Sequence, residues 1–238
     1  MSLHDRLATP EGRSRHVRRL FATIADRYDF ITVALSYGQD RGWKRRLVAL
    51  GQPAGGRRAL DLATGTGDIA FALASSGARV VGLDITPRMI ELARGKAPER
   101  SGSCAFVVGD MLALPFPDRS FEAYTIAFGI RNVTHIETAL REAHRVLKPG
   151  GRFLCLEFSQ VNLPGLDKLY DAYSFNVIPR MGKLVTGDAE PYQYLVESIR
   201  RFPDQEHFKS MIEAAGFARV NYRNLSGGIA ALHSGWRL

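Results

Sequence analysis

Apolar and polar residues along the chain follow two spacings, one typical of helices and one typical of buried strands. Val17, Leu20, Phe21 and Ile24 recur at helical spacing, and a second helix is predicted over 42–50. Beyond a Gly- and Pro-containing linker, short apolar runs alternate with helical patterns. The predicted strands cover 59–63, 79–85, 105–108, 123–128 and 152–158, and helices lie between them over 69–75 and 137–147. Because strands that alternate with helices connect by right-handed crossovers, this order predicts a mostly parallel sheet.

The C-terminal part departs from strict alternation. Helical patterns over 192–202 and 206–215 lead to two strand-like runs, 218–224 and 229–238, which a Ser-Gly-Gly turn separates. Two strands joined by such a turn form an antiparallel hairpin. The sequence therefore predicts an α/β fold whose parallel sheet ends in a hairpin, unlike the symmetric sheet of dinucleotide-binding proteins.

Composition is typical of a soluble globular protein, with 238 residues of which 45% are hydrophobic and 24% charged. This length fits one large domain. No apolar run approaches the roughly 18 residues of a membrane-spanning helix, and no apolar stretch follows the basic N-terminus as in a secretory signal. Cys104 and Cys155 lie in apolar segments, and we expect reduced, buried thiols, which indicates a cytoplasmic protein.

The net charge of +8 favours anionic partners such as nucleic acid, anionic lipid or a negatively charged metabolite. Arginines are frequent near the N-terminus, among them Arg6, Arg13, Arg15, Arg18 and Arg19. They fit either a solvated chain end, which we favour, or a patch that docks on an anionic surface.

The run Asp61-Leu-Ala-Thr-Gly-Thr-Gly-Asp68 is the first chemical signature and follows the first predicted strand. Its glycines let the backbone approach a ligand at the carboxyl end of the strand, where open α/β sheets bind small molecules. Asp84 ends the second predicted strand, where a carboxylate can accept both hydroxyls of a ribose. Gly65, Gly67 and Ala70 also fit a dinucleotide fingerprint, so these features alone leave NAD open.

Acidic residues on both sides of the turn favour a different ligand. Negative charge from Asp61 and Asp68 disfavours a pyrophosphate and suits a cationic sulfonium amino acid. Gly109-Asp-Met111 follows the third predicted strand, where an acid can bind an adenine amino group beside an apolar neighbour. The run Leu147-Lys-Pro-Gly-Gly151 precedes the fifth predicted strand. Together these elements resemble the class I S-adenosylmethionine-dependent methyltransferases, whose seven-stranded sheet ends in an antiparallel hairpin.

Longer segments narrow the resemblance. The most distinctive is Asp118-Arg-Ser-Phe-Glu-Ala-Tyr-Thr-Ile-Ala-Phe-Gly-Ile-Arg-Asn-Val133. Further segments are 147–159, 170–175, Glu197-Ser-Ile-Arg200, Phe202-Pro-Asp-Gln205 and 224–233. From about Phe21 to the C-terminus the chain resembles the ubiquinone/menaquinone biosynthesis C-methyltransferase family, which covers demethylmenaquinone methyltransferases and 2-methoxy-6-polyprenyl-1,4-benzoquinol methylases.

This resemblance implies a Rossmann-like seven-stranded sheet with helices on both faces. It implies methylation of a ring carbon of a polyprenylated benzoquinol or naphthoquinol by S-adenosylmethionine, with S-adenosylhomocysteine as product and no metal. We expect an N-terminal helical lid or substrate-contact segment over 1–50 and a cofactor-binding methyltransferase domain over 51–238. A helical insertion is expected at about 160–203.

The motifs and the resemblance together give the candidate site residues. The predicted cofactor contacts are Asp61, Gly65, Thr66, Gly67, Asp84, Ile85, Asp110, Met111 and Ala127. The predicted catalytic residues are Arg131, Asn132 and Tyr28, and the predicted substrate contacts are Tyr28, Arg131 and Tyr173. Three positions depart from the family: Thr32 and Asp40 stand where Asn and His are usual, and Ala127 stands where several relatives carry Ser.

Methyl transfer from a sulfonium is an in-line displacement, so alignment and exclusion of water supply much of the acceleration. The acceptor must be the electron-rich quinol. Arg131 is expected to stabilise its phenolate and Asn132 to orient it, because arginine stays protonated and is a poor base. The alternative is that Arg131 pairs with Glu157. The candidates for the base that removes the ring proton are Asp29, Asp171, His135 and water.

The expected partners are a lipid-soluble polyprenyl quinol and an anionic membrane, at which the protein would be peripheral. A homodimer is a further expectation, and nucleic acid is not expected. Three alternatives remain. The chain would be a methyltransferase of RNA or of another small molecule, a non-catalytic subunit of a quinone-synthesis assembly, or an NAD-dependent oxidoreductase.

Overall fold

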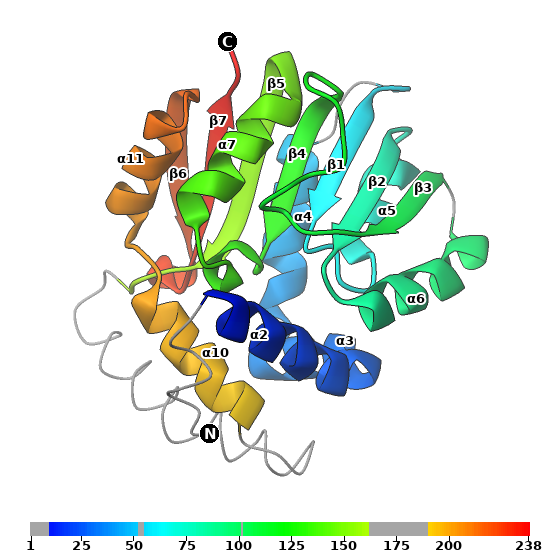
Figure 1. The fold of residues 1–238 in the computed structure, drawn as a ribbon, viewed down its shortest axis with the longest axis vertical. Coiled ribbons are helices and arrows are strands. Elements are labelled where there is room, and N and C mark those ends of the chain that lie inside the picture. Colours follow the sequence, from blue (N-terminus) through cyan, green and yellow to red (C-terminus); the bar gives the residue numbers. More distant parts are fainter. Residues whose placement is uncertain (1–9, 52–54, 101, 162–189) are drawn as a thin grey trace.

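The computed structural model describes residues 10–51, 55–100, 102–161 and 190–238. The strands are β1 (Arg58–Leu62), β2 (Arg79–Asp84), β3 (Ser103–Val108), β4 (Phe121–Ala127), β5 (Leu147–Phe158), β6 (Ala218–Leu225) and β7 (Ala230–Trp236). They form one seven-stranded sheet in the order β3-β2-β1-β4-β5-β7-β6 (Figure 1). Strands β1 to β5 pair in parallel, whereas β7 runs antiparallel to both β5 and β6. The predicted fold class is confirmed.

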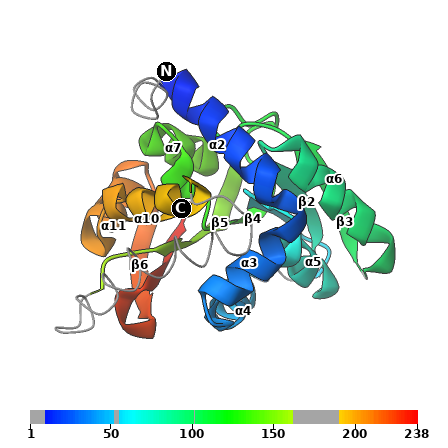
Figure 2. The same cartoon turned by 90° about the horizontal axis from the view of Figure 1, so that it is seen from below.

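Helices cover both faces of this sheet. They are α2 (Pro10–Ile24), α3 (Tyr28–Leu35), α4 (Gln39–Gly51), α5 (Asp68–Ser75), α6 (Pro87–Lys96), α7 (Ile136–Val146), α10 (Glu190–Arg201) and α11 (Gln205–Ala214). One buried cluster packs α4, α5 and α6 on one face, and a second packs α7 and α11 on the other. Figure 2 shows α4 and α5 on the side of the sheet opposite to α7. Because both faces are covered, the inner strands are mainly apolar, with buried polar exceptions such as Asp61 in β1 and Thr125 in β4.

The N-terminal helices take two different positions. Figure 1 shows α2 and α3 beneath the edge at which the parallel strands end. They pack on α10 through a third apolar cluster that includes Leu20, Ile31 and Tyr192. Helix α4 instead contributes Trp43 and Leu47 to the buried cluster that it shares with α5 and α6 on one face of the sheet. Within the described ranges, none of the helices has the length and apolar character needed to cross a membrane.

Two elements differ from the pattern-based boundaries. Helix α3 forms although its apolar residues are irregularly spaced. Ile31 is buried, whereas its apolar neighbour Phe30 is 64% exposed. Strand β5 begins at Leu147, and the register of its pairing with β4 shifts before Arg152, so the Pro-Gly-Gly run is an irregular start of the strand. The predicted insertion at 160–203 lies mostly outside the described residues, as does Tyr173.

Candidate functional site

The turn between β1 and α5 places backbone at the carboxyl edge of the sheet. Gly65 and Gly67 have φ angles of +56° and +92°, in the left-handed region that glycine enters without strain. A Cβ atom at Gly67 would lie 2.7 Å from the Phe71 ring, so the turn has no room for a side chain there. A cavity of about 450 Å³, which we name the first cavity, lies between this turn, α2 and the ends of β2 and β4.

Asp84 ends β2 and forms part of the wall of the first cavity. Its Oδ2 accepts the Gly65 N–H at 3.0 Å and its Oδ1 accepts the Thr86 N–H at 2.8 Å. Burial raises the pKa of the Asp84 carboxyl, and these two backbone donors oppose the shift. Each oxygen keeps acceptor capacity for a ligand. The carboxylate therefore offers two adjacent acceptors, which suits the two hydroxyls of a ribose.

Asp61 lies beneath the glycine turn and is 1% exposed. Its carboxylate accepts the Thr64 hydroxyl at 2.6 Å and the Thr125 hydroxyl at 2.7 Å. Burial raises its pKa to about 6, although the two hydroxyls act in the opposite direction. Asp68, at the other end of the turn, lies 3.2 Å from the Lys44 ammonium. These two acids hold the turn in place, while Asp84 presents its carboxylate at the cavity wall.

Asp110 and Met111 follow β3 and line the first cavity. Asp110 Oδ1 accepts the Leu112 N–H at 2.9 Å. The other carboxylate oxygen has no protein donor in the described residues, so it is available to a ligand N–H. Met111 beside it supplies an apolar surface. This pair suits the amino group and the ring of an adenine.

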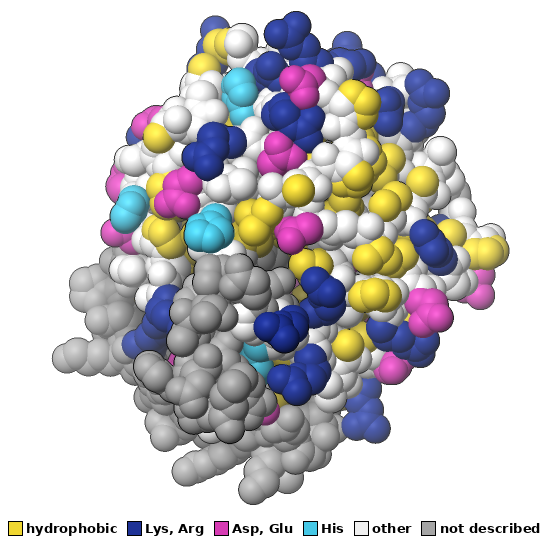
Figure 3. Space-filling model, viewed as in Figure 1, with side chains coloured by type: hydrophobic (Ala, Val, Ile, Leu, Met, Phe, Trp, Pro, Cys, Tyr) yellow, Lys and Arg dark blue, Asp and Glu magenta, His cyan; other side chains and the backbone are white. Residues whose placement is uncertain are grey.

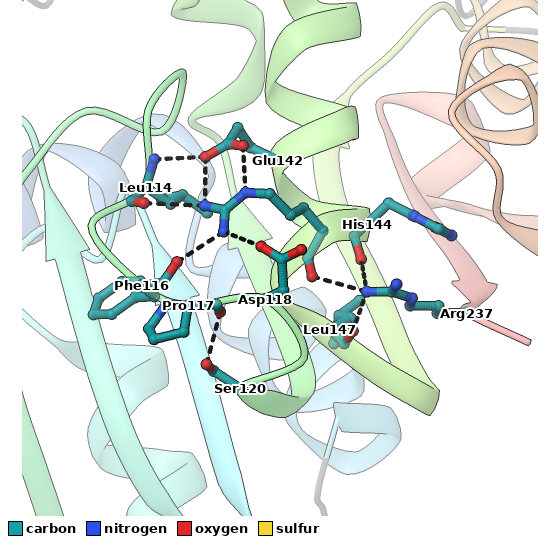
Figure 4. A network of polar contacts seen from close by, with 10 residues as sticks. Leu114, Phe116, Pro117, Asp118, Ser120, Glu142, His144, Leu147 and Arg237 are labelled. Atoms are coloured by element: carbon teal, nitrogen blue, oxygen red, sulfur yellow. Dashed lines mark hydrogen bonds and ion pairs between the residues drawn. The ribbon is translucent and has the colours of Figure 1, made fainter.

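A polar network fixes the loop that follows Asp110 and Met111 against α7 (Figure 4). Arg145 donates to the carbonyls of Leu114 at 3.1 Å and Phe116 at 2.8 Å. It also forms ion pairs of 2.8 Å with Asp118 and 2.7 Å with Glu142. Because several hydrogen bonds and ion pairs converge on the Arg145 guanidinium, they fix the loop that continues from the wall formed by Asp110 and Met111.

Thr66 does not line the first cavity but connects the turn to the N-terminal helices. Its hydroxyl donates to Asp29 Oδ1 at 2.7 Å, and Asp29 Oδ2 lies 2.7 Å from the Lys96 ammonium of α6. Burial alone would raise the pKa of Asp29, but Lys96 and Thr66 hold it below its usual value. We name Asp29, Thr66 and Lys96 the clasp, because one carboxylate joins α3 to both the turn and α6.

A second cavity, of about 530 Å³, lies between α2, α3, α10 and the ends of β4 and β5. Its apolar wall includes Leu20, Ile24, Ile31, Trp43, Phe158 and Ile229. Phe21, Tyr28 and Phe128 line both cavities, so the two spaces meet at these side chains. Burial raises the pKa of the Tyr28 phenol, and the positive charges of Lys44 and Arg131 act in the opposite direction.

Arg131 lines the second cavity and forms a buried ion pair. Its Nη1 lies 2.7 Å from Glu157 Oε1 and donates to the Phe128 carbonyl at 2.5 Å. Burial raises the pKa of Glu157, against the effect of the guanidinium. The pairing with Glu157 that the sequence left as an alternative is therefore present. Arg131 Nε is buried and bonds to nothing in the described part of the chain, so the guanidinium keeps a free donor.

The candidate residues fall into three groups. The first cavity is lined by Tyr28, Gly65, Asp84, Ile85, Asp110, Met111, Ala127 and Asn132. Thr66 and Gly67 belong to the turn and Asp61 lies beneath it, and Arg131 lines the second cavity. Tyr173 lies outside the described residues. Ligand contact by all of these residues stays a prediction.

Sequence reasoning did not select Asp40 and Tyr192, which line the second cavity, or Arg15 and Arg18, which line the first. Asp40 was noted only as a departure from the family, and none of the motifs includes Tyr192. Across the described ranges, no three His, Cys, Asp or Glu side chains are grouped as a metal site would require. The expectation of a metal-independent reaction stays a prediction.

Comparisons with known proteins confirm the family resemblance. The model of the ubiE/COQ5 methyltransferase family matches residues 9–237. A ubiquinone/menaquinone biosynthesis C-methyltransferase UbiE from Methylobacterium nodulans is 55% identical over 234 residues, which are 96% of this chain and 93% of the relative. The protein of the same name from Brucella abortus is 55% identical over 93% of this chain and 85% of its own length.

Solved structures share the fold at much lower identity. A SAM-dependent methyltransferase from Thermotoga maritima superposes with a TM-score of 0.68 at 20% identity, over 92% of this chain and 99% of its own. Phosphoethanolamine N-methyltransferase 2 from Haemonchus contortus, solved with S-adenosyl-L-methionine, gives 0.61 at 16% identity, over 82% of this chain and 52% of its own. At such identities the likeness supports the fold alone.

Proposed function

The chain belongs to the ubiE/COQ5 methyltransferase family, and we propose that it transfers the methyl group of S-adenosylmethionine to a ring carbon of a polyprenylated quinol. The observation that carries this proposal is the contact between two unlike cavities. The first has acidic and backbone polar groups in its wall, and the second is mainly apolar. They meet at Phe21, Tyr28 and Phe128, where a donor and an acceptor would come together.

The residues of the first cavity fit S-adenosylmethionine. Asp84 would bind the ribose hydroxyls, Asp110 and Met111 the adenine, and the backbone at Gly65 the amino-acid end. Ala127 has no side-chain donor or acceptor, so only its backbone would take part. When bound, the cofactor supplies an electrophilic methyl group on a positively charged sulfur. The buried Asp84 carboxylate, and Asp61 beneath the turn, give this region a negative potential that suits that charge.

The residues of the second cavity fit the acceptor. Its apolar wall would exclude water from the ring and take the first units of the isoprenoid tail. The Arg131 guanidinium, held by Glu157, would stabilise the phenolate that makes the ring carbon nucleophilic. Asn132, which lines the first cavity close to that arginine in the chain, would orient the ring oxygen. Tyr28 would close the contact between donor and acceptor.

The N-terminal helices would act as a lid. Helices α2 and α3 roof both cavities, while α4 packs into the main core, so α2 and α3 would be the part that opens and closes. The clasp would hold this lid over the glycine turn. Closure would exclude water from the reacting atoms, which favours an in-line displacement.

A lipid substrate also gives the basic N-terminal surface a role at a membrane. Arg15, Arg18 and Arg19 are exposed on α2, and Figure 3 shows Lys and Arg side chains gathered over that part of the molecule. Tyr37, at the rim of the second cavity, is 71% exposed. Liposome flotation should show binding that rises with anionic lipid. Equal binding to neutral vesicles would reject this membrane role.

The experiment that tests the proposed function supplies the enzyme with methyl-labelled cofactor and two reduced acceptors, a demethylmenaquinol and a methoxy-benzoquinol, each with a short isoprenoid tail. Mass spectrometry locates the label. Transfer to a ring carbon of at least one acceptor is expected. A thermal-shift comparison adds a second readout, because S-adenosylhomocysteine should stabilise the protein and NADH should not. Stabilisation by NADH alone would contradict the proposal.

A further inference from the structure

Two polar side chains stand out in the apolar wall of the second cavity. Asp40 is 3% exposed and Tyr192 is 2% exposed, and both line the cavity. The mechanism above uses neither of them. A carboxylate and a hydroxyl are costly to place in an apolar wall unless they bond to something.

Tyr192 lies at the start of α10, and its hydroxyl is buried without a hydrogen-bond partner among the described residues. Its ring packs with Leu20, Ile24 and Ile31 of the third apolar cluster. An unpaired buried hydroxyl destabilises a protein, and such groups need an explanation. A ligand that bonds to this hydroxyl inside the cavity would satisfy it.

Asp40 lies in the first turn of α4, where the helix dipole favours a negative charge. Its Oδ1 accepts the Ser36 hydroxyl at 2.9 Å, and its Oδ2 lies 3.4 Å from the Lys44 ammonium. Lys44 also pairs with Asp68 at 3.2 Å, so it does not depend on Asp40 alone. The carboxylate is thus held beside a cation and has acceptor capacity left for a donor inside the cavity.

We infer, on the basis of the proposed function, that Tyr192 and Asp40 bind the two oxygens of the acceptor ring and that Asp40 makes the cavity select the reduced quinol over the oxidised quinone. A quinol carries hydroxyl groups that donate to a carboxylate. A quinone carries only carbonyl oxygens, which accept and are repelled by a carboxylate. Tyr192 can donate to an oxygen of either form.

This selection has a chemical purpose. Only the electron-rich quinol ring attacks a methyl sulfonium, so a bound quinone would block the cavity without reacting. A site that merely recognised ring shape and tail would bind the two forms equally, because they share both. A buried anion at one ring oxygen distinguishes them through hydrogen-bond polarity alone.

The test measures binding of both redox forms under anaerobic conditions, by calorimetry, to the protein saturated with S-adenosylhomocysteine. The probe is a benzoquinol with one isoprenoid unit and its quinone. Wild-type protein should bind the quinol about tenfold more tightly, the effect of one hydrogen bond to a charged group. Asp40→Asn should remove that preference, because an amide can donate to a carbonyl. Tyr192→Phe should weaken the binding of the quinol and of the quinone by a similar factor.

Two controls separate binding from folding. Tyr192→Phe removes an unpaired hydroxyl, so the melting temperature of the ligand-free protein should not fall, although substrate binding does. If Asp40→Asn unfolds or loses affinity for S-adenosylhomocysteine, Asp40→Glu replaces it and should retain the quinol preference. The wild-type ratio of the two dissociation constants needs no variant at all.

Equal binding of quinol and quinone by the wild type would overturn the inference, as would an unchanged preference in a folded Asp40→Asn protein. If the quinol is methylated but the preference is absent, the proposed function stands and only the inference fails. If the wild type neither binds nor methylates the quinol, both fail.

Discussion

The Arg131 guanidinium lies 2.7 Å from the Glu157 carboxylate, in an ion pair whose side chains are 5% and 1% exposed. Glu157 is the last residue but one of β5 and Arg131 follows β4, so the pair joins the ends of two neighbouring strands at the second cavity. A buried pair of this kind places a fixed positive charge where a phenolate would form. Substitutions at Arg131 and Glu157 can therefore separate the effect of the pair on stability from the effect of the positive charge on activity.

Replacing Arg131 by Met should lower the free energy of unfolding by about 3 kcal/mol, because it leaves Glu157 buried without its partner. Adding Glu157→Gln should restore most of that stability, since the unpaired charge is removed. In both variants kcat should be at least about a hundredfold lower than in the wild type, because the positive charge near the phenolate is gone. Urea unfolding and kcat measure the two effects, and recovery of kcat in the double variant would assign Arg131 a structural role only.

Asp84→Asn should weaken binding of S-adenosylhomocysteine about tenfold or more, because an amide offers one acceptor where the carboxylate offers two. Calorimetry measures the affinity. Glu99→Gln is the matched control, because Glu99 is an exposed carboxylate away from both cavities. Equal losses in the two variants would mean that overall charge, rather than Asp84 itself, governs the affinity.

Breaking the clasp should affect ligand affinity more than stability. Asp29→Asn removes the ion pair with Lys96, whose partners are 45% and 31% exposed, so the free energy of unfolding should change by less than about 1 kcal/mol. The dissociation rate of S-adenosylhomocysteine should rise, because the ion pair no longer ties α3 to Lys96 of α6. Asp26→Asn breaks only the exposed pair with Arg88 and serves as control. Unchanged dissociation in Asp29→Asn would reject the lid role.

Asp61 should make stability depend on pH. Its pKa is raised from 3.8 to about 6 on folding, so the folded state binds a proton that the unfolded state has lost. This contribution is fully present below about pH 4 and disappears as the pH rises to about 6, an effect of about 3 kcal/mol. The unfolding free energy of the wild type minus that of Asp61→Asn should fall by that order across this range. A flat difference would contradict the burial argument.

The sequence indicated most of the sheet because its inner strands are buried on both faces and are therefore mainly apolar. The sequence could place Asp84 and Asp110 beside the first cavity because Asp84 ends β2 and Asp110 follows β3, at the edge where open α/β sheets bind ligands. Such reasoning places a residue at an edge but does not tell where its side chain points. Asp61 illustrates this limit, since its carboxylate turns to Thr64 and Thr125 beneath the turn.

The second cavity was harder to foresee because it is built by contacts between distant segments. Asp40 and Tyr192 are far apart in the chain and line one space only after α3, α4 and α10 have packed. Their local patterns are those of ordinary helices, in which an acid in the first turn and an aromatic on an apolar face need no ligand. The polar groups in this cavity could therefore be recognised only from the packing of the helices, because no sequence motif indicates them.

The proposed methyl transfer depends on one arrangement, with the cofactor in the first cavity and the acceptor ring in the second. A crystal structure with S-adenosylhomocysteine and a short-tailed quinol tests it most directly. We expect the ribose on Asp84 and the adenine beside Met111. We expect the ring beside Arg131, with its oxygens on Asp40 and Tyr192 and its reacting carbon facing the sulfur across Tyr28. A ring bound outside the second cavity, or a nucleoside bound within it, would contradict the account.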